Sequence, residues 1–164
     1  MELIFMRHGK AEDHALRPSD FERELTEEGR SRTLTVAAGL QQCLGEQKPR
    51  IWCSPLVRTR QTAEIVAGVL GGLEIELNED IPDGHLHRLA RGWSALNEDE
   101  SLLIVGHEPH LSRWIAHLSG VVLPMKPACV AGLIVHPDKP TQGKLRWFAH
   151  PDVLGRVGTS TQMA

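Results

Sequence analysis

The chain has 164 residues, of which 24% are charged, and its formal net charge is −3 at pH 7. This length suits one domain with a full core, since domains usually contain ~100–200 residues. The charges form no basic block, which argues against nucleic-acid binding, and no apolar run reaches the ~20 residues of a membrane span.

The amino terminus and the cysteines predict a reduced, cytoplasmic protein. The chain opens directly into a strand-like segment, without the basic stretch and cleavage site of a secretory signal. The three cysteines, Cys43, Cys53 and Cys129, are odd in number and share no metal-binding or redox spacing.

Strand-like and helical patterns alternate along the chain. Strands are predicted at residues 2–6, 50–53, 73–77, 101–105, 129–136 and 144–149. Helices are predicted at residues 26–43, 56–70, 86–96 and 110–118. This order predicts an α/β fold, a three-layer α/β/α sandwich with a mostly parallel central sheet.

The ends of this pattern define the expected boundaries. Residues 1–153 are expected to form a single domain, and residues 154–164, which are polar and contain glycine, a frayed tail. Residues 137–143 contain two prolines and are expected to be the turn between the last two strands.

Two histidines stand directly after apolar strands. His8 lies between Arg7 and Gly9 after the strand at residues 2–6, and His107 follows the strand at residues 101–105. Open α/β sheets build their sites at the carboxyl ends of strands, so these residues are expected to meet at one edge.

A third strand end supplies another cation. Arg58 lies near the start of the helix predicted after Ser54 and Pro55, and a helix N-terminus provides backbone donors for an anion. Each segment alone has a simpler structural interpretation. For example, Ser-Pro often only starts a helix. Two histidines and two arginines at one sheet edge together indicate phosphate chemistry.

The residue types suit phosphoryl transfer. A neutral, oriented imidazole such as that of His8 is a good nucleophile, and an arginine matches phosphate oxygens with a planar fork. Gly9 would allow a tight turn and the approach of a phosphate to the backbone. His107, if protonated, would add positive charge where the transition state gathers negative charge.

These segments resemble a known family. Arg7-His8-Gly9 and the segments at residues 54–63 and 105–109 are similar to the three signatures of the histidine phosphatase superfamily, with its phosphoglycerate-mutase-like fold. The short chain and the segment at residues 25–29 are most similar to the SixA-type phosphohistidine phosphatases.

The resemblance extends from Met1 to about Asp152 and implies roles by position. His8 would be the nucleophile that becomes phosphorylated, and the residues that bind the phosphoryl group would be Arg7, Arg58 and His107. Arg23 stands before Leu-Thr, where the family often has an arginine that reaches the phosphate; a solvated loop arginine is the equal alternative. No metal and no cofactor is implied, because the arginines supply the positive charge.

The proton donor of larger family members has no obvious counterpart. Those proteins carry it in an insertion after the third strand, whereas here the segment at residues 72–100 leaves no room for a lid. The turn Pro82-Asp83-Gly84-His85 has a histidine where the small members have an aspartate. Asp80 or Asp83 could reach the site, but the turn-residue interpretation is the stronger one for each.

An open site without an acid favours a phosphohistidine on a protein of the histidine-phosphotransfer type, because a protonated imidazole leaves without further help. A phosphatase for small phosphomonoesters is the first alternative. A catalytically silent phosphate-binding or interaction module is the second. A metal-binding protein that uses His85, His87, His107 and His110 is the third.

Overall fold

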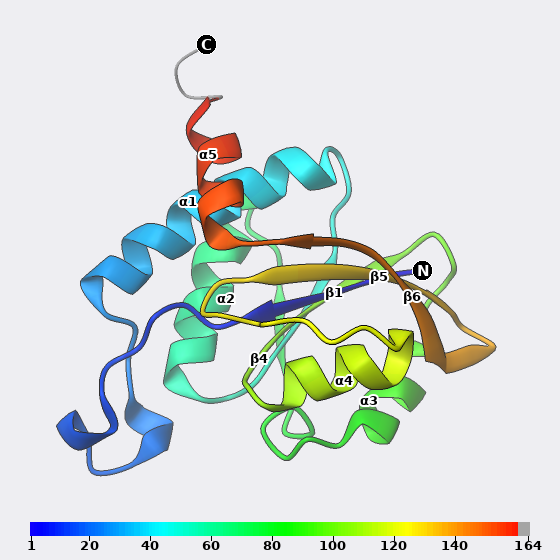
Figure 1. Ribbon diagram of the computed structural model, residues 1–164, viewed down its shortest axis with the longest axis horizontal. Coiled ribbons are helices and arrows are strands. Elements are labelled where there is room, and N and C mark those ends of the chain that lie inside the picture. Colours follow the sequence, from blue (N-terminus) through cyan, green and yellow to red (C-terminus); the bar gives the residue numbers. More distant parts are fainter. Residues whose placement is uncertain (161–164) are drawn as a thin grey trace.

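The computed structural model describes residues 1–160, which form one six-stranded mixed sheet with helices on both faces (Figure 1). The strands run in the order β3-β2-β4-β1-β5-β6. The first four are parallel to one another, and β5 runs antiparallel to both of its neighbours, β1 and β6. The strand bounds are β1 (Glu2–Arg7), β2 (Arg50–Cys53), β3 (Ile75–Leu77), β4 (Ser101–Gly106), β5 (Val130–His136) and β6 (Lys139–Ala149).

Five α-helices and two short 3₁₀ turns of the described residues surround this sheet. In the view of Figure 1, α1 and α5 lie above the sheet and α3 and α4 lie below it. The bounds are α1 (Glu27–Leu44), α2 (Val57–Val69), α3 (Leu86–Trp93), α4 (His110–Ser119) and α5 (Pro151–Ser160), with the 3₁₀ turns at His14–Leu16 and Asp20–Glu22.

The three-layer arrangement is confirmed by β1, whose side chains alternate between the apolar clusters on the two faces of the sheet. Leu3 and Phe5 belong to the apolar cluster under α3 and α4, whereas Ile4 and Met6 belong to the cluster under α1, α2 and α5. All four are fully buried, as expected for a central strand covered on both faces. A continuous apolar strand therefore supports two cores at once.

Two expectations for the carboxyl-terminal part are wrong. Residues 139–143 belong to β6 and are not a turn, because the strand accommodates them with register shifts opposite β5. The tail is not frayed from residue 154 to Ser160, because α5 packs against α1 and buries Leu154. Gly39 permits this close approach, since a Cβ there would overlap the Leu154 backbone. Residues 161–164 of the expected tail lie outside the described residues.

The strand order brings the predicted site residues to one edge. Since β2, β4 and β1 are neighbours and parallel, their carboxyl ends lie side by side. Arg7 pairs in register with Gly106, and Cys53 pairs with Val105. His8, Ser54 and His107 are the residues that follow these pairs. Separately, none of the helices within residues 1–160 is long and apolar enough to cross a membrane.

Candidate active site

The carboxyl edge of the sheet brings together three buried side chains, those of His8, Arg58 and His107. Their exposed fractions are 7%, 6% and 6%, respectively. Arg58 Nε donates a hydrogen bond to His8 Nε2 over 3.3 Å, and the rings of His8 and His107 have their centroids 5.5 Å apart. Three residues that lie far apart in the sequence thus form one contact group, which we call the catalytic cluster.

The hydrogen bonds of His8 determine which of its nitrogens can react. Nδ1 lies 2.7 Å from the carbonyl oxygen of Gly9, and a carbonyl can only accept, so Nδ1 carries the proton. Nε2 then carries no proton, and its lone pair accepts the hydrogen bond from Arg58. Burial lowers the pKa of His8 to about 3, with His107 and Arg58 adding to the effect. His8 is therefore a neutral imidazole at pH 7, the form required of a nucleophile.

Gly9 has a packing role that the sequence did not reveal. A Cβ at this position would overlap the hydroxyl of Thr33 on α1. The Gly9 N–H donates to Thr62 Oγ1 on α2 over 3.1 Å, and Thr62 in turn donates to the Arg58 carbonyl. Thr62 thus ties the His8 loop to the helix that carries Arg58. The reason for glycine at this position is close packing against α1.

Arg7 lies beside the cluster. One guanidinium nitrogen donates to the Met125 carbonyl over 3.0 Å. Burial lowers the pKa of Arg7, and the nearby carboxylate of Glu108 partly offsets this effect. The Arg7 Nε is buried without a hydrogen-bond partner in the described part of the chain.

His107 differs from the sequence expectation in its charge. Its Nε2 lies 2.7 Å from Ser54 Oγ, and its Nδ1 is buried without a partner among residues 1–160. Burial and the charge of Arg58 lower its pKa to about 4, so that the ring is neutral at pH 7. His107 can therefore act as a hydrogen-bond group but not as an added positive charge in this state.

The unpartnered nitrogens of Arg7 and His107 indicate what the site binds. A buried polar group without a partner costs about 1–3 kcal/mol, so such groups mark places where a ligand supplies the partner. Arginine can only donate, and the second guanidinium of the site, that of Arg58, is near enough to contribute to the lowered pKa of Arg7. An oxyanion satisfies this arrangement, and phosphate offers enough oxygens for several donors.

Asp20 is a member of the site that sequence reasoning missed. Its carboxylate accepts from Arg58 over 2.9 Å and from Arg23 over 2.8 Å. Burial raises the pKa of Asp20, but the hydrogen bonds from Arg23 and Arg58 outweigh this effect and lower it to about 2. No motif marks Asp20, because only the folding of its loop brings it to α2.

Arg23 contacts the site only indirectly within the described residues, because it donates to Asp20, which also accepts from Arg58. Its other donors go to the Glu12 carbonyl and to His14, and it makes no hydrogen bond to the catalytic cluster within the described residues. Its role as a phosphate ligand stays a prediction.

Neither of the two candidate acids touches the catalytic cluster through the hydrogen bonds of the described chain. Asp80 contacts His85 over 3.1 Å and Arg88 over 3.3 Å, and Asp83 lies 4.0 Å from His85. The segment between β3 and β4 contains α3 as its one helix, in agreement with the expected absence of a lid.

The histidines of the metal-binding alternative do not form a metal site. Within residues 1–160, no group of three or more His, Cys, Asp or Glu side chains is arranged to hold a metal ion. His110 stacks on Trp114, and His87 lies edge-on to His117, with centroids 5.9 Å apart in both pairs.

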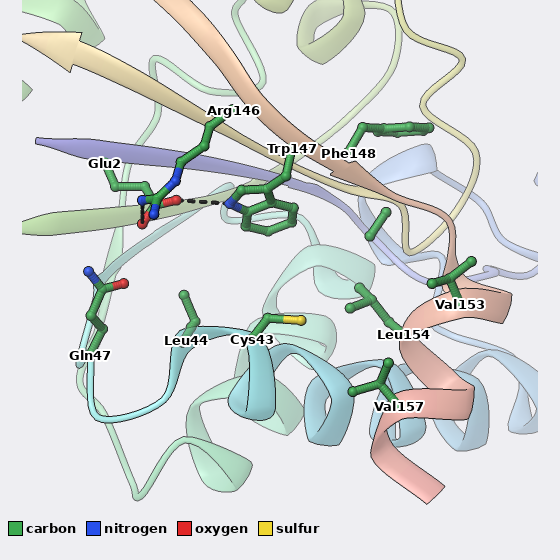
Figure 2. Close-up of a pocket in the computed structure, with 11 residues that line it drawn as sticks. Glu2, Cys43, Leu44, Gln47, Arg146, Trp147, Phe148, Val153, Leu154 and Val157 are labelled. Carbon is green, nitrogen blue, oxygen red and sulfur yellow. Dashed lines mark hydrogen bonds and ion pairs between the residues drawn. The ribbon is translucent and has the colours of Figure 1, made fainter. Parts of the chain in front are cut away.

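A cavity of about 530 Å³ between α1, α5 and β6 contains no residue of the catalytic cluster in its lining (Figure 2). Its walls come from α1, β6 and α5, and they are largely apolar. The polar groups at its margin satisfy one another, since Glu2 accepts from Trp147 Nε1 over 2.9 Å and pairs with Arg146. Size alone therefore does not identify the functional site, whereas convergent, unsatisfied donors do.

The fold and the cluster define an α/β protein whose candidate site lies at the carboxyl edge of its sheet. The model of the histidine phosphatase superfamily (branch 1) matches residues 3–90, and the chain belongs to this superfamily. A Picosynechococcus sp. protein described as uncharacterized is 38% identical over 160 residues, which cover 93% of this chain and 92% of that protein.

Solved structures agree with this assignment. The protein histidine phosphatase SixA complexed with tungstate is 27% identical, with a TM-score of 0.82 over 94% of this chain and 99% of that one. Phosphoglycerate mutase from Plasmodium falciparum has a TM-score of 0.66 at 17% identity, covering 90% of this chain and 89% of that one. The latter match concerns the fold alone, and together the matches confirm the phosphoglycerate-mutase-like architecture and support phosphatase activity.

Proposed function

We propose that this protein is a phosphohistidine phosphatase that works through a phosphohistidine intermediate on His8. The observation that carries the proposal is the hydrogen bond from His8 Nδ1 to the Gly9 carbonyl, which leaves the Nε2 lone pair directed toward Arg58. The similarity to the SixA protein histidine phosphatase supports the substrate class.

The reaction proceeds in two displacements. The lone pair of His8 Nε2 attacks phosphorus, the bond between phosphorus and the substrate imidazole breaks, and the electron pair leaves with that imidazole. Water then attacks the phosphoryl group on His8, which releases inorganic phosphate and restores the neutral ring. Arg7, Arg58 and His107 hold the phosphoryl oxygens while negative charge gathers on them.

The carboxylates of the site favour this leaving group. An alkoxide needs a proton from a general acid, whereas a substrate imidazole that is already protonated does not. Asp20 is the carboxylate that hydrogen-bonds to the catalytic cluster, and its lowered pKa keeps it ionised at pH 7. A site without a protonated acid suits phosphoramidates better than alkyl phosphates.

A side-by-side assay tests the proposal. A phosphohistidine-bearing phosphotransfer domain, a phosphoserine peptide and small phosphate esters would be compared at equal enzyme concentration. We expect brisk release of phosphate from phosphohistidine, measurable release from p-nitrophenyl phosphate and very slow release from phosphoserine. Faster hydrolysis of small alkyl phosphates would favour the phosphomonoesterase alternative, and no release from any of them would favour a silent binding module.

The same assay tests the absence of an acid. Asp80→Asn and Asp83→Asn should each leave the phosphohistidine rate within a few-fold of the wild type. A general acid contributes about 10²–10⁴-fold, so a loss of a hundredfold on alkyl phosphates in either variant would contradict the proposal.

A further inference from the structure

Ser54 contacts the His107 ring through its hydroxyl and is completely buried. The residue follows β2, and its backbone is fixed by two contacts. Its N–H donates to the Val105 carbonyl of β4 over 3.2 Å, and its carbonyl accepts from Thr59 Oγ1 over 2.9 Å. The hydroxyl is therefore held at a defined place against the imidazole of His107.

The proton of the Ser54 hydroxyl has one acceptor. Within residues 1–160 the partners of Ser54 Oγ are the Leu56 N–H, at 3.4 Å, and His107 Nε2, at 2.7 Å. A backbone N–H can only donate, so His107 Nε2 is the one acceptor among these partners, and only donation to it satisfies the buried hydroxyl proton. Nε2 must then hold a lone pair, which places the proton of the neutral ring on Nδ1.

This assignment explains the buried, unpartnered nitrogen of His107. An Nδ1 that carries a proton is a donor, and it lies near enough to Arg7, whose Nε is also buried without a partner within residues 1–160, for the charge of Arg7 to lower the pKa of His107. We propose that Ser54 is a positioning residue that fixes His107 in its Nδ1–H tautomer, so that a neutral imidazole donates to a phosphoryl oxygen of the substrate. The inference rests on the proposed function, because it names the phosphoryl group as the acceptor.

The same contact opposes protonation of His107. A doubly protonated ring would donate from Nε2 to the Ser54 oxygen and leave the hydroxyl proton without an acceptor in the described surroundings. Such a loss is costly for a buried group. Ser54 therefore selects the tautomer and reinforces the neutral state that burial sets, which a hydrogen bond of merely structural importance would not do.

The tautomer is measurable in the wild type by ¹⁵N NMR of labelled histidine, because protonated and unprotonated ring nitrogens have well-separated shifts. We expect His107 to show a protonated Nδ1 and an unprotonated Nε2. Ser54→Ala should give a mixture of tautomers and a raised pKa for His107, and should weaken both kcat/KM and tungstate binding by about tenfold, the size of one hydrogen bond.

Two further variants separate positioning from folding. Ser101→Ala removes the hydroxyl of another buried serine, at the opposite end of β4 from His107, so it should preserve the His107 tautomer and pKa. Ser54→Cys keeps the shape of the side chain and a weak donor, so it should lie between the wild type and Ser54→Ala. A wild-type His107 protonated at Nε2 would overturn the proposal, as would a Ser54→Ala variant that matches Ser101→Ala in every measurement.

These outcomes are separable from those of the proposed function. If the wild type hydrolyses phosphohistidine while His107 is the Nε2–H tautomer, the role of Ser54 is wrong and the function stands. If the tautomer is as expected but none of the phosphorylated substrates is hydrolysed, the proposed function is wrong, and loss of tungstate affinity in Ser54→Ala still tests the positioning role.

Discussion

His8 and His107 occupy matching places at the ends of two neighbouring parallel strands, yet they present opposite nitrogens to the site. At β1, a backbone carbonyl binds Nδ1 and leaves Nε2 with a lone pair. At β4, a serine hydroxyl binds Nε2 and leaves Nδ1 unpartnered within residues 1–160. Burial holds both rings neutral, so the difference comes from the partner alone. One residue type can thereby supply both the nucleophile and the donor of the proposed reaction.

Of the two histidines, His8 should cause the larger loss of turnover when it is replaced. His8→Ala removes the attacking lone pair, so turnover should fall by at least about a thousandfold while the fold persists. His107→Ala removes one donor and should cost much less. Acid-quenched enzyme incubated with labelled substrate should contain acid-labile phosphate in the wild type and none in His8→Ala. Equal losses in the two variants would remove the distinction between nucleophile and donor.

Arg58 donates to His8, and its charge lowers the pKa of His107, so its loss should have the next largest effect. A charge-assisted contact to a buried oxyanion is worth ~1.5–3 kcal/mol, so Arg58→Ala should lower kcat/KM about tenfold to more than a hundredfold. Arg60→Ala is the matched control, because Arg60 lies on the same helix with its side chain exposed. Thermal shifts with tungstate should be lost in Arg58→Ala and retained in Arg60→Ala. Full tungstate affinity in Arg58→Ala would exclude Arg58 from the site.

The two neutral rings should also affect stability at low pH. Both folded-state pKa values, about 3 and about 4, lie below the ordinary value of 6.5. Above pH 6.5 the rings are neutral in both states and contribute nothing to the pH dependence. As the pH falls from 6.5 toward 4, the unfolded chain binds protons that the folded protein does not, so the free energy of unfolding should decrease.

Urea denaturation between pH 7 and pH 4 measures this decrease, with a slope of up to ~1.4 kcal/mol per pH unit for each histidine. His8→Asn should reduce the slope, whereas His117→Asn, an exposed histidine outside the site, should leave it unchanged. A slope that His8→Asn does not alter would contradict the buried, neutral state of His8.

Asp20 should give the smallest effect. Its carboxylate occupies donors of Arg58 and Arg23 that an oxyanion would also use. Asp20→Asn removes the competing charge, so tungstate should bind a few-fold more tightly by calorimetry. Asp13→Asn alters a carboxylate of the same loop that caps the first 3₁₀ turn, and it should bind tungstate as the wild type does. Weaker tungstate binding by Asp20→Asn would show that Asp20 supports the anion site instead of competing with it.

The sequence predicted the parts of the site that follow strands. His8, Arg58 and His107 stand after apolar segments, and parallel strands bring their carboxyl ends to one edge, so their meeting could be anticipated. Asp20 and Thr62 could not be anticipated, because each contacts the site from a loop or a helix whose direction depends on packing. The role of Ser54 was hidden within a motif that also starts helices.

The fold shows the same division. The alternation of apolar strands and amphipathic helices was sufficient to predict a three-layer α/β arrangement. The length of β6 and the helix α5 were missed, because prolines and glycines interrupt their local patterns. Their stability comes from partners distant in sequence, namely β5 for the strand and the glycine-lined surface of α1 for the helix.

By itself, the sequence determined that two histidines and two arginines share a sheet edge, because hydrophobic periodicity fixes where strands end. Only the tertiary structure decided the chemical state of each group. Whether an imidazole is neutral, and which of its nitrogens is free, depends on burial and on a hydrogen-bond partner that the chain brings from elsewhere. For His8 that partner is the next residue, Gly9, whereas for His107 it is Ser54, at the end of another strand.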